Sequence, residues 1–248
     1  MSKEYFDEFG APTDLLMGKA FPEFSESVKR EPLFRILDWG VDRYQGDAPE
    51  IDWLIEDILP SETPGMVCSL GGVGKSYLMM DLCVRLAAGP GLGPSFALGG
   101  RMPRRGRAVM ITAEDSSKAL HRRLDQILQE SEKEKLRDWL FIVPLADHQG
   151  QKSLLATHGG EYVMTEVWDE LVEQIVELSQ MPGGIDLLVL DPLQAMVMAD
   201  VNSDPAAAAA FWSAISGLCA QVKCTCLVTH HMNKASIGGV EGPMGARE

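Results

Sequence analysis

A short glycine-rich segment, SLGGVGKS at residues 69–76, constrains the fold of this chain more than any other feature. The apolar run MVCSL leads into it and suits a buried strand, while Leu78, Met79, Leu82 and Leu86 follow at helical spacing. Strand, glycine loop and helix together form a site where backbone N–H groups and a helix N-terminus face an anion. The segment matches the Walker A pattern, with serine in place of the usual first glycine.

Each position of this loop has a predicted role. Lys75 is expected to reach the β- and γ-phosphates of a nucleotide, and the Ser76 hydroxyl is expected to bind Mg²⁺. ATP and Mg²⁺ are therefore the predicted cofactors. The predicted nucleotide-binding residues are Ser69, Gly71, Gly72, Val73, Gly74, Lys75, Ser76 and Tyr77.

The rest of the chain alternates apolar runs with amphipathic segments. Strands are predicted at 107–114, 141–145, 185–191 and 224–229, and the polar, glycine-containing stretch 146–160 is predicted to be a loop. This alternation predicts an α/β fold, in which helices flank a mostly parallel central sheet.

The chain divides near residue 50. Residues 1–50 mix acidic residues, aromatics and prolines without sustained periodicity, and we interpret them as an N-terminal arm or appendage. Residues 51–248 carry the regular α/β pattern. Because the last stretch, 235–248, is glycine-rich and no strand follows it, we expect this domain to continue beyond the given sequence.

Composition narrows the class of protein. A net charge of −14 argues against a broad basic surface that coats DNA, although a narrow basic channel formed by assembly is compatible with it. The five cysteines lie in apolar segments without metal-site spacing, as in a reducing cytosol. We expect neither a signal peptide nor a run that approaches the length of a membrane span. A cytoplasmic protein without a membrane partner is the prediction.

Two carboxylates are candidates for catalysis. Asp191 ends the run IDLLVLD, where a Walker B carboxylate holds Mg²⁺ through water, although a plain strand-terminating aspartate has the same pattern. Since Pro192 follows it, the base that activates water has to come from elsewhere. Glu114, at the end of strand 107–114, is the candidate base, and a polar strand end is the alternative. Its neighbour Asp115 is better explained as a helix cap.

Two histidines follow the predicted strand 224–229. At least one of His230 and His231 should reach the same sheet edge, where it could sense phosphate or relay a proton. A structural histidine is almost as good an explanation. The arginine cluster at 101–107 is more typical of a solvated loop than of a nucleic-acid site.

This set of motifs resembles the RecA-like ATPases that include plasmid RepA-type hexameric replicative helicases, with KaiC-like and DnaB-like ATPases as more distant relatives. The resemblance spans residues 53–248. It rests on SLGGVGKS (69–76), TAED (112–115), LVLDP (188–192), THHMNK (229–234) and MGAR (244–247).

The resemblance implies a RecA-like sheet, usually assembled as a ring, such as a hexamer, of identical subunits. It implies Lys75 and Ser76 at phosphate and Mg²⁺, Glu114 as the base and Asp191 as Walker B. His230 or His231 would be the sensor. The resemblance further implies a channel-facing loop at 233–245 and an arginine, Arg247, after that loop. Single-stranded DNA is the implied partner.

Three functions fit these residues. The first is a DNA-dependent motor such as a replicative helicase. The second is a KaiC-like ATP switch that controls assembly or a partner. The third is a small-molecule kinase, which ranks last because a glutamate placed to activate water suits hydrolysis better.

Overall fold

The computed structural model describes residues 34–91, 96–150, 152–198, 201 and 204–232. Its contacts group the chain into two units, Met1–Glu50 and Ile51–Glu248. The described part of the first unit holds two single-turn 3-10 helices, η2 (Ile36–Trp39) and η3 (Val41–Tyr44), and all its residues from 34 to 50 are exposed.

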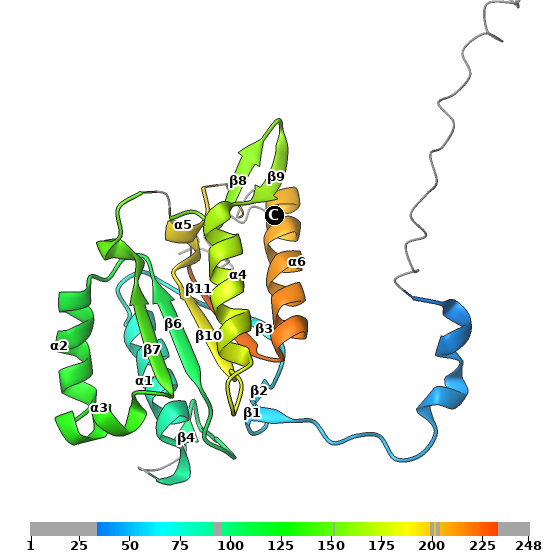
Figure 1. Cartoon of the computed structure of the whole chain (residues 1–248), viewed down its shortest axis with the longest axis horizontal. Helices are drawn as coiled ribbons and strands as arrows, with labels where there is room; N and C mark the ends of the chain where they lie inside the picture. The colour runs from blue at the N-terminus through cyan, green and yellow to red at the C-terminus, as the bar shows by residue number, and fades with distance from the viewer. Residues whose placement is uncertain (1–33, 92–95, 151, 199–200, 202–203, 233–248) are drawn as a thin grey trace, which may run out of the picture. The chain divides into compact units, whose positions relative to one another are not determined.

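A five-stranded parallel sheet forms the centre of the second unit (Figure 1), as the sequence predicts. Along the sheet the order is β3-β11-β10-β6-β7, so the last strand of the chain lies between the glycine-loop strand and the Asp191 strand. The strands are β3 (Pro64–Ser69), β6 (Ala108–Thr112), β7 (Leu140–Pro144), β10 (Leu187–Asp191) and β11 (Thr225–His231).

Helices cover both faces of this sheet. Alternate residues of β10 point to opposite faces, so Leu187 and Val189 pack with α1 while Leu188 and Leu190 pack with α4 and α6. The first face carries α1 (Lys75–Ala88), α2 (Ser117–Ile127) and α3 (Glu130–Leu136), and the second carries α4 (Glu166–Ser179), α5 (Leu193–Met196) and α6 (Pro205–Val222). Strands buried on both faces explain the continuous apolar runs in the sequence.

Helix α6 corrects one expectation. We expected no apolar run as long as a membrane span, but α6 has 18 residues and a composition compatible with one. Its buried residues Phe211, Ile215 and Leu218 nevertheless belong to the core shared with α4 and the sheet. The helix begins as predicted, since the Asp204 side chain accepts hydrogen bonds from two amides of the first turn and Pro205 follows it.

Short elements complete the unit. The stretch 146–160, predicted to be a loop, instead contributes one strand of an antiparallel hairpin, β8 (Leu155–His158) with β9 (Glu161–Met164). The remaining elements are β1 (Trp53–Ile55), β2 (Leu59–Pro60), β4 (Phe96–Ala97), β5 (Gly100–Arg101), η4 (Gly89–Gly91) and η5 (Leu145–Asp147).

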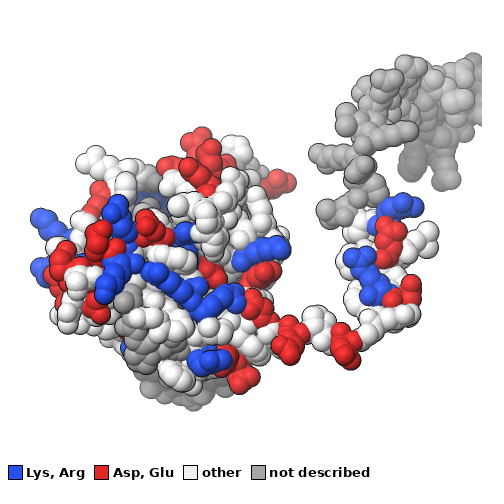
Figure 2. Space-filling model, turned by 60° about the horizontal axis from the view of Figure 1, so that its bottom comes forward, with Lys and Arg blue, Asp and Glu red and all other residues white. Residues whose placement is uncertain are grey.

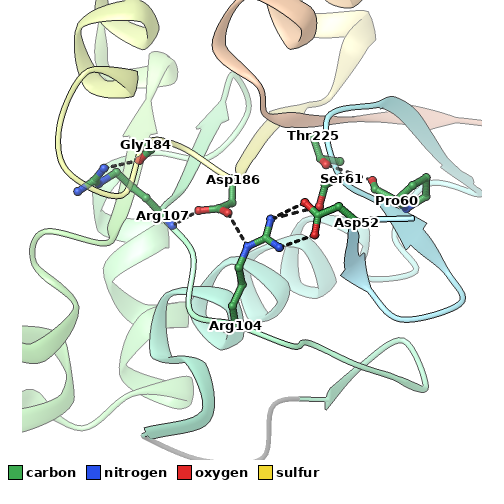
Figure 3. A network of polar contacts seen from close by, with 8 residues as sticks. All are labelled: Asp52, Pro60, Ser61, Arg104, Arg107, Gly184, Asp186 and Thr225. Atoms are coloured by element: carbon green, nitrogen blue, oxygen red, sulfur yellow. Dashed lines mark hydrogen bonds and ion pairs between the residues drawn. The ribbon is translucent and has the colours of Figure 1, made fainter. Parts of the chain in front are cut away.

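The arginine cluster is not a plain solvated loop. The Arg104 guanidinium contacts Asp52 at 2.6 Å and Asp186 at 3.3 Å, which joins the β1–β2 region to the segment before β10 (Figure 3). The Arg107 side chain is 3% exposed and donates to backbone carbonyls, among them those of Asp138 and Pro182. These arginines therefore hold together the edge of the sheet where β6 and β10 begin.

Candidate active site at the carboxyl edge of the sheet

The alternation of side chains brings four polar residues to one face of the sheet at its carboxyl edge. Leu227 packs on the α1 face, so Thr229 and His231, which share its parity along β11, point the same way. By the same rule Asp191 follows Val189 on β10. Thr112, at the end of β6, pairs with Asp191 in the parallel register.

The glycine loop runs from β3 into α1 at this edge. Gly72 and Gly74 have φ of 80° and 92°, a left-handed conformation that side chains other than glycine rarely adopt. Helix α1 then begins at Lys75, and no side chain caps its first turn. The N–H groups of that turn are the donors that a phosphate would use.

Lys75 lies against the loop rather than in solvent. Its Nζ donates to the backbone oxygens of Ser69 at 2.9 Å and Leu70 at 3.0 Å, and lies 3.0 Å from His231 Nδ1. Only 7% of Lys75 is exposed. Burial lowers its pKa below the ordinary value, while the charges of Asp191, Cys68 and Glu114 act in the opposite direction.

The contact with Lys75 selects a tautomer of His231. An ammonium has three N–H donors and no acceptor, so Nδ1 of His231 accepts in this contact and the ring proton lies on Nε2. The three donors of Lys75 are then all engaged, by Ser69, Leu70 and His231.

Asp191 is 2% exposed at the end of β10. Its Oδ1 accepts a short hydrogen bond from the Thr229 hydroxyl on the neighbouring strand, and its backbone oxygen accepts from the Ala113 amide at 2.9 Å. This pairing orients the carboxylate within the electrostatic reach of Lys75.

The donors at this edge fit Mg²⁺. Mg²⁺ prefers oxygen ligands and binds through few protein groups, phosphates and water, which the Ser76 hydroxyl and the Asp191 carboxylate match. Among the described residues there is no cluster of three histidine, cysteine or acidic side chains that could hold a metal by itself. A Mg²⁺ ion here would depend on the nucleotide for part of its coordination.

Glu114 lies beyond its strand. Strand β6 ends at Thr112, not at residue 114, and Glu114 is exposed in the bend that follows, where its charge reaches Lys75. The helix cap is also reassigned. The Ser116 side chain caps α2, whereas Asp115 forms an ion pair with Arg123. Glu114 is thus left as the solvent-accessible carboxylate of this bend.

The two histidines lie within β11, not after it, and point to opposite faces. His231 meets Lys75. His230 is 1% exposed, and its Nδ1 lies 2.7 Å from Gln194 Nε2 of α5. The sequence could not separate the two histidines, because their difference depends on where the strand ends.

Residues 29–236 match the AAA domain family, a RecA-like family of P-loop ATPases. The chain belongs to this family. The match begins at residue 29, earlier than the resemblance at 53–248 suggested, so part of the N-terminal unit belongs to the region that the AAA domain family shares.

The remaining residues predicted to bind the nucleotide lie in or beside the loop. Ser69 contributes its backbone oxygen to Lys75, and a Cβ on Gly71 would lie 3.8 Å from His231 Nδ1. Val73 and Tyr77 are 61% and 39% exposed.

Arg247 and the segment 233–245 lie outside the described residues. Thr229 and Gln194 were not predicted from the sequence. Thr229 lies two residues before His231 on one strand, and this spacing indicates that both side chains point to the same face.

Proposed function

We propose that this AAA domain binds and hydrolyses ATP with Mg²⁺, and that it drives a DNA-dependent motor of the replicative helicase class. The observation that carries the first part is the position of Lys75, at the start of an uncapped helix and within reach of the charges of Asp191 and Glu114. P-loop ATPases combine these groups to hold phosphates and to activate water.

The proposed binding step uses the loop. Backbone amides of 71–76 would cradle the β- and γ-phosphates. To reach these phosphates, Lys75 would give up at least one of the three acceptors that it contacts in this structure. His231 is the acceptor whose release costs least, because the other two are oxygens of the loop itself. A Mg²⁺ ion held by Ser76 and, through water, by Asp191 would neutralise charge on the phosphates.

The proposed chemical step uses Glu114. Its carboxylate would accept a hydrogen bond from the attacking water and take its proton as the oxygen adds to the γ-phosphorus and the bond to the β-phosphate oxygen breaks. The exposure of Glu114 at the open edge of the sheet supports this role, since a water molecule can approach it. His231, freed from Lys75, would donate its Nε2 proton in a hydrogen bond to the transferred phosphoryl group.

The motor part of the proposal rests on the motif set shared with RepA-type helicases. A ring of identical subunits would gather the segments 233–245 around single-stranded DNA, in the cytoplasm. Hydrolysis in each subunit would then change the contact with the strand.

A second function, an ATP-driven switch without motor activity, is favoured by the charge of the chain. The net charge is −14, and acidic and basic side chains are mixed on the face shown in Figure 2. A surface of this kind attracts DNA weakly, because phosphate contacts depend on clustered lysine and arginine.

Hydrolysis measured with and without single-stranded DNA separates the two functions. The motor predicts faster steady-state release of phosphate when DNA is added, and a loss of this stimulation as salt rises. The Lys75→Ala variant gives the background rate of phosphate release. Hydrolysis that is unchanged by DNA, together with nucleotide-dependent assembly, would reject the motor in favour of the switch.

A further inference from the structure

One side chain links the ends of β10 and β11 on the face opposite the glycine loop. Gln194 lies in α5, three residues after Asp191, and its Nε2 is 2.7 Å from His230 Nδ1 and 3.4 Å from the backbone oxygen of His231. On the loop face, the Thr229 hydroxyl binds Asp191. The last residues of β11 are therefore held to the end of β10 from both faces.

The two contacts of Gln194 define the orientation of its amide. Both partners of Nε2 are acceptors in this arrangement, since His231 offers a carbonyl oxygen and His230 an unprotonated Nδ1. Rotating the amide by 180° would instead place Oε1 against the His231 carbonyl, two oxygens at 3.4 Å. With Nε2 as the donor to both acceptors, His230 accepts through Nδ1 and carries its ring proton on Nε2.

Gln194 is linked to Lys75 through one residue, His231. The backbone carbonyl that Gln194 contacts belongs to His231, whose ring accepts from Lys75 at 3.0 Å. If the end of β11 moves, the His231 ring moves with it. The end of β11 is also held on its other side by β3, through pairing of His231 with Ser69 and a hydrogen bond of 2.9 Å from the Met232 amide to the Ser69 oxygen, so Gln194 supplies its restraint on the β10 side.

We propose that Gln194 is a positioning residue that fixes the end of β11, so that the His231 ring meets Lys75 before ATP binds and the transferred phosphoryl group afterwards. This inference rests on the proposed ATP hydrolysis. Gln194 itself lies on the opposite face of the sheet and touches neither nucleotide nor water in this account.

The test compares Gln194→Ala and Gln194→Glu with the parent chain. Glutamate keeps the size of the side chain and can accept from His230, but it cannot donate to the His231 carbonyl. Both variants are expected to lower kcat by about fivefold, the effect of one lost hydrogen bond, with little change in the affinity for ATP. Gln174→Ala is the control, since that amide lies on the exposed side of α4 and binds only Glu170 among the described residues at 3.3 Å.

A second readout does not depend on hydrolysis. ¹⁵N spectra of the histidine rings report which nitrogen carries the proton, and the parent chain should show His231 with its proton on Nε2. Gln194→Ala should convert this signal into a mixture of tautomers, and Gln174→Ala should not.

The outcomes are distinct. An unchanged kcat with an unchanged His231 signal in Gln194→Ala would overturn the inference. A fall in melting temperature and in the number of nucleotide sites, without a change in kcat per site, would also overturn it and leave Gln194 a structural role. If the parent chain hydrolyses no ATP, the proposed function fails, and the histidine spectra still decide whether Gln194 positions His231.

Discussion

The Nζ of Lys75 lies 3.0 Å from the Nδ1 of His231, so the lysine of the glycine loop is held by the strand that separates this loop from Asp191. A phosphate that binds Lys75 competes with this contact. We therefore expect nucleotide binding to be coupled to the end of β11, which precedes the segment 233–248 in the sequence.

His231→Ala tests that coupling. Removal of the ring frees one donor of Lys75, so ATP should bind at least as tightly as in the parent chain. The kcat should fall, because no side chain then replaces the hydrogen bond to the phosphoryl group, by roughly tenfold for a bond to a charged group. Isothermal titration with a non-hydrolysable ATP analogue and steady-state kinetics measure the two effects. Weaker binding with an unchanged kcat would show that His231 supports the loop instead.

Glu114→Gln should keep ATP binding and abolish most turnover. The amide has nearly the same size but cannot take a proton from water, and loss of a general base lowers rates by about 10²- to 10⁴-fold. Single-turnover hydrolysis measures this step directly. Glu173→Gln, an exposed change on α4, should behave like the parent chain. Normal turnover in Glu114→Gln would remove this residue from the mechanism.

Asp191→Asn should raise the Mg²⁺ concentration needed for half-maximal hydrolysis. A carboxylate that holds the ion through water belongs to its outer shell, where substitutions cost about 10- to 100-fold in affinity or activity. The measurement is a Mg²⁺ titration of the hydrolysis rate, with chelation by EDTA as the zero point. An unchanged Mg²⁺ requirement would contradict the placement of the ion.

Asp204 gives a prediction for stability and its pH dependence. The hydrogen bond from Tyr162, followed by those from the amides of α6, holds the pKa of Asp204 below its ordinary value. A lowered folded-state pKa stabilises the fold fully above the unfolded-state pKa of about 3.9, and this contribution is lost as pH falls through the folded-state value.

Asp204→Ala should accordingly lower the melting temperature at pH 7 by about 2–4 °C, the cost of one helix cap in a domain of this size. The difference from the parent chain should shrink as the pH is lowered below about 4. Thermal denaturation followed by circular dichroism measures both. A difference that is independent of pH would mean that the charge of Asp204 does not contribute.

The sequence predicted the elements whose pattern is local. The loop at 69–76 and the buried runs that became β6 and β10 depend on neighbouring residues alone, so their places were predicted to within a few residues. The parallel sheet followed from the alternation of strands and helices.

Other features depend on contacts between distant residues. Which histidine faces Lys75 follows from the parity of β11 and from its extension to His231, and no local signal marks that extension. The contact between Gln194 and His230 requires β10 and β11 to be neighbours. The hairpin of β8 and β9 was missed because its polar, glycine-containing sequence has the composition of a loop.

We propose that Lys75 and Glu114 serve one ATP-hydrolysing site. The most direct test measures Mg²⁺-dependent phosphate release from ATP, together with nucleotide binding, for the parent chain, Lys75→Ala and Glu114→Gln. We predict hydrolysis only in the parent chain, with binding lost in Lys75→Ala and kept in Glu114→Gln. Equal hydrolysis in all three proteins, or tight ATP binding without Lys75, would contradict the account.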